Sequence, residues 1–141
     1  MLKQIFIIDD DQVSIFLAEA MLEHMGYKHK VESFLDPEKA LPCILQKLQQ
    51  NPEAEYLIFL DLNMPVMSGW DFLDELLVHA ADLRDRCYIV ILSAAIDGRE
   101  IDRCLQHPLT LNFVPKPLDE TAFELITEML QRKDFMPAIR E

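Results

Sequence analysis

The chain has 141 residues, half of them hydrophobic, and a formal net charge of −12 from 25 acidic and 13 basic side chains. This composition excludes a disordered chain, and the length suits one domain that needs neither disulfides nor a structural metal. No apolar stretch approaches the roughly 20 residues that span a bilayer. The apolar run after Lys3 ends at Asp9 and is too short for a signal peptide, so we expect a cytoplasmic protein.

The charge and the cysteines narrow the classes of partner. An acidic surface repels phosphate backbones and anionic lipids, so we expect no binding to nucleic acid or membranes, whereas a divalent cation or a basic partner suits it. The cysteines, Cys43, Cys87 and Cys104, form no C-x-x-C motif, and the histidines do not stand at zinc-ligand spacings. We therefore expect reduced thiols.

Short apolar segments alternate with longer segments of helical periodicity from the start of the chain. The first two strands are expected at residues 5–8 and 31–34, the second being more polar. Asp36 and Pro37 then provide a cap and a first-turn proline for the second helix. The first helix is expected to stop near Gly26. The apolar stripe that we expect to face the core from this helix consists of Val13, Phe16, Leu17, Ala20, Met21 and Leu22.

The same alternation continues in the second half. Strands are expected at residues 57–60, 88–92 and 111–114. The third helix opens with the capping box at residues 68–71, and Asp97-x-x-Glu100 caps a short fourth helix.

The last helix begins at Asp119, and its expected apolar face consists of Ala122, Leu125, Ile126 and Met129. We assign residues 1–131 to the domain and residues 132–141 to a frayed C-terminal tail, whose Phe135 and Met136 are candidates for docking.

Strict alternation of strand and helix predicts an α/β fold, a doubly wound five-stranded parallel sheet with helices on both faces. Strands buried on both faces are continuously apolar, as the first, third and fourth are here. These three are therefore placed centrally, and the strand order 2-1-3-4-5 follows.

Polar residues follow the strands. Residues 9–11, all aspartates, come after the first strand, Asp61 after the third, Ser93 after the fourth and Lys116-Pro117 after the fifth. In a parallel sheet these carboxyl ends share one edge, where ligands of open α/β sheets bind. The sequence thus predicts that Asp9, Asp10 and Asp61 converge.

Three clustered carboxylates repel one another, by roughly 4 kcal/mol for two charges about 4 Å apart at an effective dielectric near 20. A divalent cation relieves this repulsion, and oxygen ligands favour Mg²⁺. Asp61 then suits a nucleophile that forms an aspartyl-phosphate, with Lys116 and Ser93 to bind the phosphoryl group. Taken singly, the acids are equally typical of turns, caps and strand ends, and Lys116 of a surface amine; the prediction depends on their joint occurrence.

The sequence resembles the receiver domain of two-component response regulators, in particular single-domain, chemotaxis-regulator-like members. The resemblance extends from about residue 3 to residue 131. It is carried by four segments: Ile7-Ile8-Asp9-Asp10-Asp11, Leu60-Asp61-Leu62-Asn63-Met64-Pro65-x-Met67-Ser68-Gly69, Ile91-Leu92-Ser93-Ala94 and Phe113-Val114-Pro115-Lys116-Pro117. It implies the flavodoxin-like (βα)5 fold with strand order 2-1-3-4-5.

The resemblance also implies roles. Asp61 is the expected phosphoacceptor, and Asp9, Asp10 and Asp61, with the backbone carbonyl of Asn63, are the expected Mg²⁺ ligands. Lys116 is expected to pair with phosphate and to precede a cis proline.

Two positions are expected to act as switches. Ser93 stands where threonine is commoner and keeps the hydroxyl. Phe113 occupies the aromatic switch position but lacks a phenolic donor, so a half-buried strand aromatic remains an alternative interpretation.

These features favour a response regulator that takes a phosphoryl group from the phosphohistidine of a histidine kinase or phosphotransfer protein. It is expected not to be an enzyme beyond its own phosphorylation and slow dephosphorylation. Only about ten residues follow the last helix, so output is expected through a partner or through a domain outside this chain, as a monomer or a phosphorylation-dependent dimer.

Two alternatives remain. A haloacid-dehalogenase-like phosphatase uses Asp-x-Asp, but Asn63 stands in place of its second acid. A receiver fold that serves only as an interaction module usually lacks one of the acids or the lysine, all of which are present here.

Overall fold

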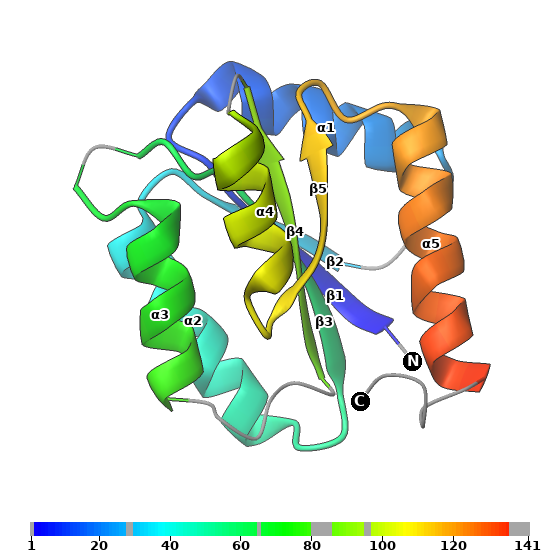
Figure 1. Cartoon of the computed structure of the whole chain (residues 1–141). Helices are drawn as coiled ribbons and strands as arrows, with labels where there is room; N and C mark the ends of the chain where they lie inside the picture. Colours follow the sequence, from blue (N-terminus) through cyan, green and yellow to red (C-terminus); the bar gives the residue numbers. More distant parts are fainter. Residues whose placement is uncertain (1, 28–29, 65, 80–85, 95–96, 136–141) are drawn as a thin grey trace.

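In the computed structural model, the described residues are 2–27, 30–64, 66–79, 86–94 and 97–135, without the side chains of 3 and 133–135. Strands and helices alternate along them (Figure 1). The elements are β1 (Leu2–Ile8), α1 (Gln12–His24), β2 (Lys30–Phe34), α2 (Pro37–Gln50), β3 (Glu55–Leu60), α3 (Gly69–His79), β4 (Cys87–Ser93), α4 (Gly98–Gln106), β5 (Thr110–Pro115) and α5 (Glu120–Phe135).

The sheet has five parallel strands in the order β2-β1-β3-β4-β5, which confirms the predicted fold class and topology. β4 is buried along its whole length and β3 from its second residue onward, while β2 and most of β5 are only half-buried. The apolar central strands and more polar edge strands therefore lie where continuous hydrophobicity predicted them.

Side-chain caps begin four of the helices, and those of α2, α3 and α4 are the expected ones. The side chains of Asp11, Asp36 and Asp97 accept backbone N–H groups at the starts of α1, α2 and α4. At the start of α3, the Asp71 amide donates to Ser68 Oγ and the Ser68 amide donates to the Asp71 carboxylate, a reciprocal capping box.

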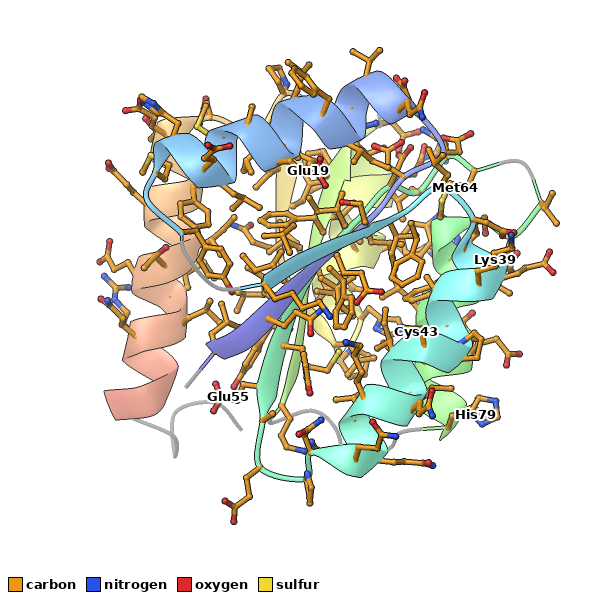
Figure 2. All side chains as sticks on the ribbon, turned by 180° about the vertical axis from the view of Figure 1, so that it is seen from behind. Glu19, Lys39, Cys43, Glu55, Met64 and His79 are labelled. Atoms are coloured by element: carbon orange, nitrogen blue, oxygen red, sulfur yellow. The ribbon has the colours of Figure 1, made fainter. Side chains whose placement is uncertain are left out.

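Two apolar layers sandwich the sheet, because alternate residues of each strand face opposite sides. One layer packs α2, α3 and α4 against residues such as Phe6, Ile58 and Ile89. The other packs α1 and α5 against residues such as Ile7 and Phe59. Figure 1 shows the helices flanking the sheet, and Figure 2 shows the side chains that fill the space between.

The predicted core face of α1 is largely wrong. Ile15, Ala18 and Leu22 are buried, whereas Val13 and Phe16 are 63% and 67% exposed, and Leu17 is also exposed. The helix carries apolar residues on most of its circumference, so periodicity alone did not select the side that packs against the sheet.

The last helix also differs from the prediction. Ile126 is buried, but Leu125, assigned to the same apolar face, is exposed. The helix continues to Phe135, beyond the predicted start of the tail at residue 132. The side chain of Phe135 and all of Met136 lie outside the described residues. Within the described chain, no helix has the length and apolar character required to cross a membrane.

Candidate functional site

The sheet brings the predicted residues to one edge. Asp9 follows β1 and Asp61 follows β3, and the Asp61 amide donates to the Ile8 carbonyl across the strand pair. Ser93 ends β4, and the amide of Lys116, which follows β5, donates to the Ser93 carbonyl. Pairing in register thus places four strand ends side by side, as predicted.

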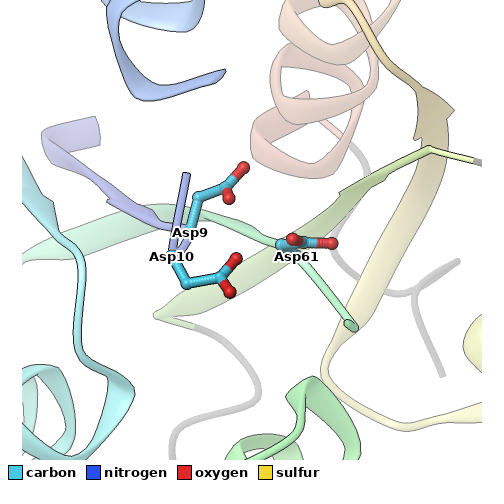
Figure 3. Close-up of side chains that lie close together, drawn as sticks. All are labelled: Asp9, Asp10 and Asp61. Atoms are coloured by element: carbon cyan, nitrogen blue, oxygen red, sulfur yellow. The ribbon is translucent and has the colours of Figure 1, made fainter. Parts of the chain in front are cut away.

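Three carboxylates meet at this edge (Figure 3). One oxygen of each of Asp9, Asp10 and Asp61 lies within 4.8 Å of the others. Asp9 and Asp61 are only 3% and 5% exposed, whereas Asp10 is exposed to solvent. The cluster therefore combines two buried acids with one that solvent reaches.

Asp61 is held by donors on both carboxylate oxygens. The hydroxyl of Ser93, itself fully buried, donates to Oδ1 over 3.0 Å, and the Asn63 amide donates to the same atom over 3.3 Å. The Lys116 ammonium lies 3.5 Å from Oδ2. Such donors orient a carboxylate and neutralise part of its charge.

Lys116 contacts Asp9 more closely than Asp61. Its Nζ atom lies 2.7 Å from Asp9 Oδ2 and also donates to Ser14 Oγ over 3.1 Å. Burial lowers the pKa of the Lys116 amine, but the hydrogen bond to Asp9 and the negative charges of Asp61 and Asp9 outweigh burial, so this pKa lies above its ordinary value. Lys116 therefore provides a fixed positive charge. The Lys116–Pro117 peptide bond is cis, as the resemblance implies.

Asp9 is the most constrained acid of the cluster. Its Oδ1 accepts the Asp11 amide over 2.9 Å, and its Oδ2 faces Lys116. Burial raises the pKa of the Asp9 carboxyl, and the Asp61 charge adds to this, against the hydrogen bonds from Lys116 and the Asp11 amide. The carboxylate form of Asp9 would thus be stabilised by a further cation.

The donor set fits Mg²⁺. The titratable groups of the cluster are carboxylates alone, with no histidine or cysteine among them, and such hard oxygen ligands favour Mg²⁺ or Ca²⁺ over zinc or copper. The exposed position of Asp10 leaves one side of the cluster open to water, which Mg²⁺ retains in its coordination shell.

Comparison with known families agrees with this geometry. The model of the response regulator receiver domain matches residues 5–131. The chain belongs to this family. No protein with curated annotation matches it.

Solved structures share the receiver fold. A two-component response regulator from Cytophaga hutchinsonii is 23% identical, with a TM-score of 0.82 over 92% of this chain and 98% of that chain. A receiver protein from Rhodospirillum rubrum is 27% identical, with a TM-score of 0.68 over 96% and 94%. The receiver domain of an Arabidopsis thaliana histidine kinase, solved with Mg²⁺, is 26% identical, with a TM-score of 0.75 over 90% and 91%.

The loop after β3 returns against the backbone of Asp61. The Gly69 amide donates to the Leu62 carbonyl over 3.0 Å. A Cβ atom at position 69 would lie 2.6 Å from the backbone oxygen of Asp61 and 2.7 Å from Leu62 Cα. Only glycine fits this approach, a requirement that the sequence motif contains but does not explain.

Phe113 is half-buried on β5, and its side chain packs against the layer under α2, α3 and α4. Side-chain contacts also connect α3 with α4 and with His107, the residue after α4. The guanidinium of Arg103 lies 3.9 Å from the centre of the Trp70 ring, and His107 Nε2 lies 3.6 Å from Asp74 Oδ1. Trp70 therefore connects the start of α3 to α4.

Ser14 is the residue at the site that sequence reasoning missed. It lies 102 positions from Lys116 along the chain, yet its hydroxyl accepts a hydrogen bond from that ammonium. Its position three residues after the Asp11 cap could have indicated a role at the start of α1. Nothing in the neighbouring sequence indicates its contact with the end of β5.

Proposed function

We propose that this receiver domain accepts a phosphoryl group on Asp61 from the phosphohistidine of a histidine kinase or phosphotransfer protein, in a reaction that depends on Mg²⁺. The observation that carries this is the placement of the buried Asp61 carboxylate within reach of a hydroxyl, an ammonium and two further carboxylates. That combination provides a nucleophile, donors for phosphoryl oxygens and a cation site at one point.

In the proposed reaction, an oxygen of Asp61 forms a bond to phosphorus while the phosphorus–nitrogen bond of phosphohistidine breaks, and its electron pair returns to the imidazole. Asp9, Asp10, Asp61 and the Asn63 carbonyl would hold the Mg²⁺, which supplies charge neutralisation at the phosphoryl oxygens. Lys116 adds a second positive charge, and its fixed protonation suits this role.

After transfer, Ser93 and Lys116 would bind phosphoryl oxygens instead of the carboxylate of Asp61. This exchange would bias an existing equilibrium of α4, β5 and α5, with Phe113 responding through packing. The signal would pass in the cytoplasm to a protein partner, from a monomer or a phosphorylation-dependent dimer. Slow hydrolysis of the mixed anhydride would reset it, and we propose no other enzymatic activity.

Thermal unfolding with beryllofluoride, which mimics a phosphoryl group on a carboxylate, tests this proposal. We expect Mg²⁺ and beryllofluoride together to raise the melting temperature of the wild type and of Asp102→Asn, and not that of Asp61→Asn. Asp102→Asn is the matched control because it makes the same chemical change at an exposed position of α4. If Mg²⁺ and beryllofluoride leave the melting temperature of the wild type unchanged, the result contradicts the proposal and favours a receiver fold that serves only as an interaction module. Rapid turnover of small phosphomonoesters would favour the phosphatase.

A further inference from the structure

Ser14, the third residue of α1, joins the helix cap to the ammonium of Lys116. Its hydroxyl donates to Asp11 Oδ2 over 3.1 Å and accepts from Lys116 Nζ over 3.1 Å. Asp11 is itself fixed, because its other oxygen accepts the Val13 amide at the start of the helix. The proton of Ser14 thus points to Asp11, and a lone pair faces Lys116.

This arrangement constrains the direction of the ammonium. Lys116 has three N–H donors and, at 2.7 and 3.1 Å, makes two close contacts, with Asp9 and Ser14. With these two donors engaged, the third is directed towards Asp61, whose Oδ2 lies 3.5 Å away. Without Ser14, the ammonium would rotate about its contact with Asp9.

Ser14 differs from the other partners of Lys116 because it is neutral and belongs to α1. Asp9 and Asp61 are carboxylates of the acidic cluster and would both be drawn to a cation. The contact with Ser14 does not compete with that cation. It is therefore the anchor that remains for Lys116 when the cluster binds a metal.

We propose that Ser14 is a positioning residue for Lys116, directing its ammonium at the phosphoryl group that Asp61 accepts; this inference rests on the function proposed above. Ser14 does not touch the reacting atoms. It acts by limiting the orientations of the Lys116 ammonium.

The test compares Ser14→Ala with Ser14→Thr, which keeps the hydroxyl. A cavity of about 40 Å³ beside Ser14 and Lys116, walled by Leu17 and Leu92, has room for the added methyl group. Thr127→Ala is the control, because it removes a helix hydroxyl that donates to the Phe123 carbonyl on α5.

The rate of phosphorylation by phosphoramidate with Mg²⁺ is the first readout. We expect Ser14→Ala to react about fivefold more slowly than the wild type, which corresponds to the loss of one ordinary hydrogen bond. Ser14→Thr and Thr127→Ala should react at about the wild-type rate. An unchanged rate in Ser14→Ala overturns the inference. So does a slow Ser14→Thr, because the hydroxyl would then not be the cause.

NMR spectroscopy of the lysine ammonium groups is the second readout and does not depend on phosphorylation. We expect the Lys116 ammonium signal, identified by its loss in Lys116→Met, to broaden or vanish through faster hydrogen exchange in Ser14→Ala and to persist in Ser14→Thr. An identical signal in Ser14→Ala overturns the inference. If the wild type accepts no phosphoryl group, the proposed function fails, and this signal still decides whether Ser14 fixes Lys116.

Discussion

The Nζ atom of Lys116 lies 2.7 Å from Oδ2 of Asp9 and 3.5 Å from Oδ2 of Asp61. The Lys116 ammonium thus lies closer to Asp9, a proposed metal ligand, than to Asp61, the proposed phosphoacceptor. A metal ion that competes for Asp9 would free the ammonium to move towards Asp61. The proposed metal binding and the proposed activation of Asp61 would thus be coupled through one side chain, that of Lys116.

Replacing Lys116 by methionine should expose the repulsion within the acidic cluster. Without the ammonium, Asp9 and Asp61 lose their shared cation, and we expect a loss of about 2 kcal/mol in the free energy of unfolding at neutral pH. Added Mg²⁺ should restore more stability to Lys116→Met than to the wild type, as measured by urea titration. Lys30→Met removes an exposed lysine that pairs with Glu32 over 3.8 Å, and it should change stability by less than about 0.5 kcal/mol. Equal effects of the two substitutions would contradict the assigned role of Lys116.

Gly69→Ala should disturb the backbone that carries Asp61. The added Cβ would lie 2.6 Å from the Asp61 carbonyl oxygen, so the loop must shift, at a cost of about 2 kcal/mol. We also expect slower phosphorylation, because Asp61 moves relative to Ser93. Gly98→Ala is the control, since a Cβ there meets no atom within 4 Å. Comparison of melting temperatures and phosphorylation rates checks this, and a fully stable Gly69→Ala would refute the close approach.

Ser93→Ala should separate phosphorylation from the conformational response. Trp70, the only tryptophan of the chain, stacks under Arg103 of α4, so its fluorescence reports how α4 lies against α3. We expect beryllofluoride with Mg²⁺ to change this fluorescence in the wild type and in Ser93→Thr. Ser93→Ala should bind the analogue and show a much smaller change in fluorescence. The reason is that it lacks the hydroxyl that would move to bind the phosphoryl group. An unaltered response in Ser93→Ala would argue against a switch at this position.

His107 should make stability depend on pH. Its Nδ1 accepts the Leu109 amide, so a proton added there breaks that bond. Burial lowers the pKa of His107, and the charge of Arg103 adds to this, although Asp74 opposes both. The folded state therefore binds this proton less readily than the unfolded chain, and the stability that the neutral ring contributes is lost as the pH falls through the pKa of the folded state.

Urea unfolding at a series of pH values between neutrality and mild acid tests this sign. We expect the stability of the wild type to decrease with falling pH more steeply than that of His107→Asn, which keeps an acceptor near the Leu109 amide but does not titrate. Parallel curves for the two proteins would show that His107 does not carry the effect.

The sequence predicted the shared position of these residues because each stands at, or directly after, the end of a strand. Asp9 and Asp61 come immediately after apolar runs, and parallel pairing leaves no freedom about which edge they share. Ser93, the last residue of β4, and Lys116, which directly follows β5, reach the same edge in this way.

Helix faces and contacts between helices were less accessible to sequence analysis. On α1, an apolar surface on most sides left the buried face ambiguous, and Phe16 was assigned to the wrong side. The contacts of Ser14 with Lys116 and of Trp70 with Arg103 depend on how each helix is rotated against its neighbour. No residue pattern within either segment specifies that rotation.

Mass spectrometry after reaction with phosphoramidate tests the central claim most directly. With Mg²⁺, we expect the wild type to gain one phosphoryl group, located on the peptide that contains Asp61. Neither Asp61→Asn nor the wild type with excess chelator should gain it. Phosphorylation of Asp61→Asn to the wild-type extent, or of the wild type at another residue, would contradict the account.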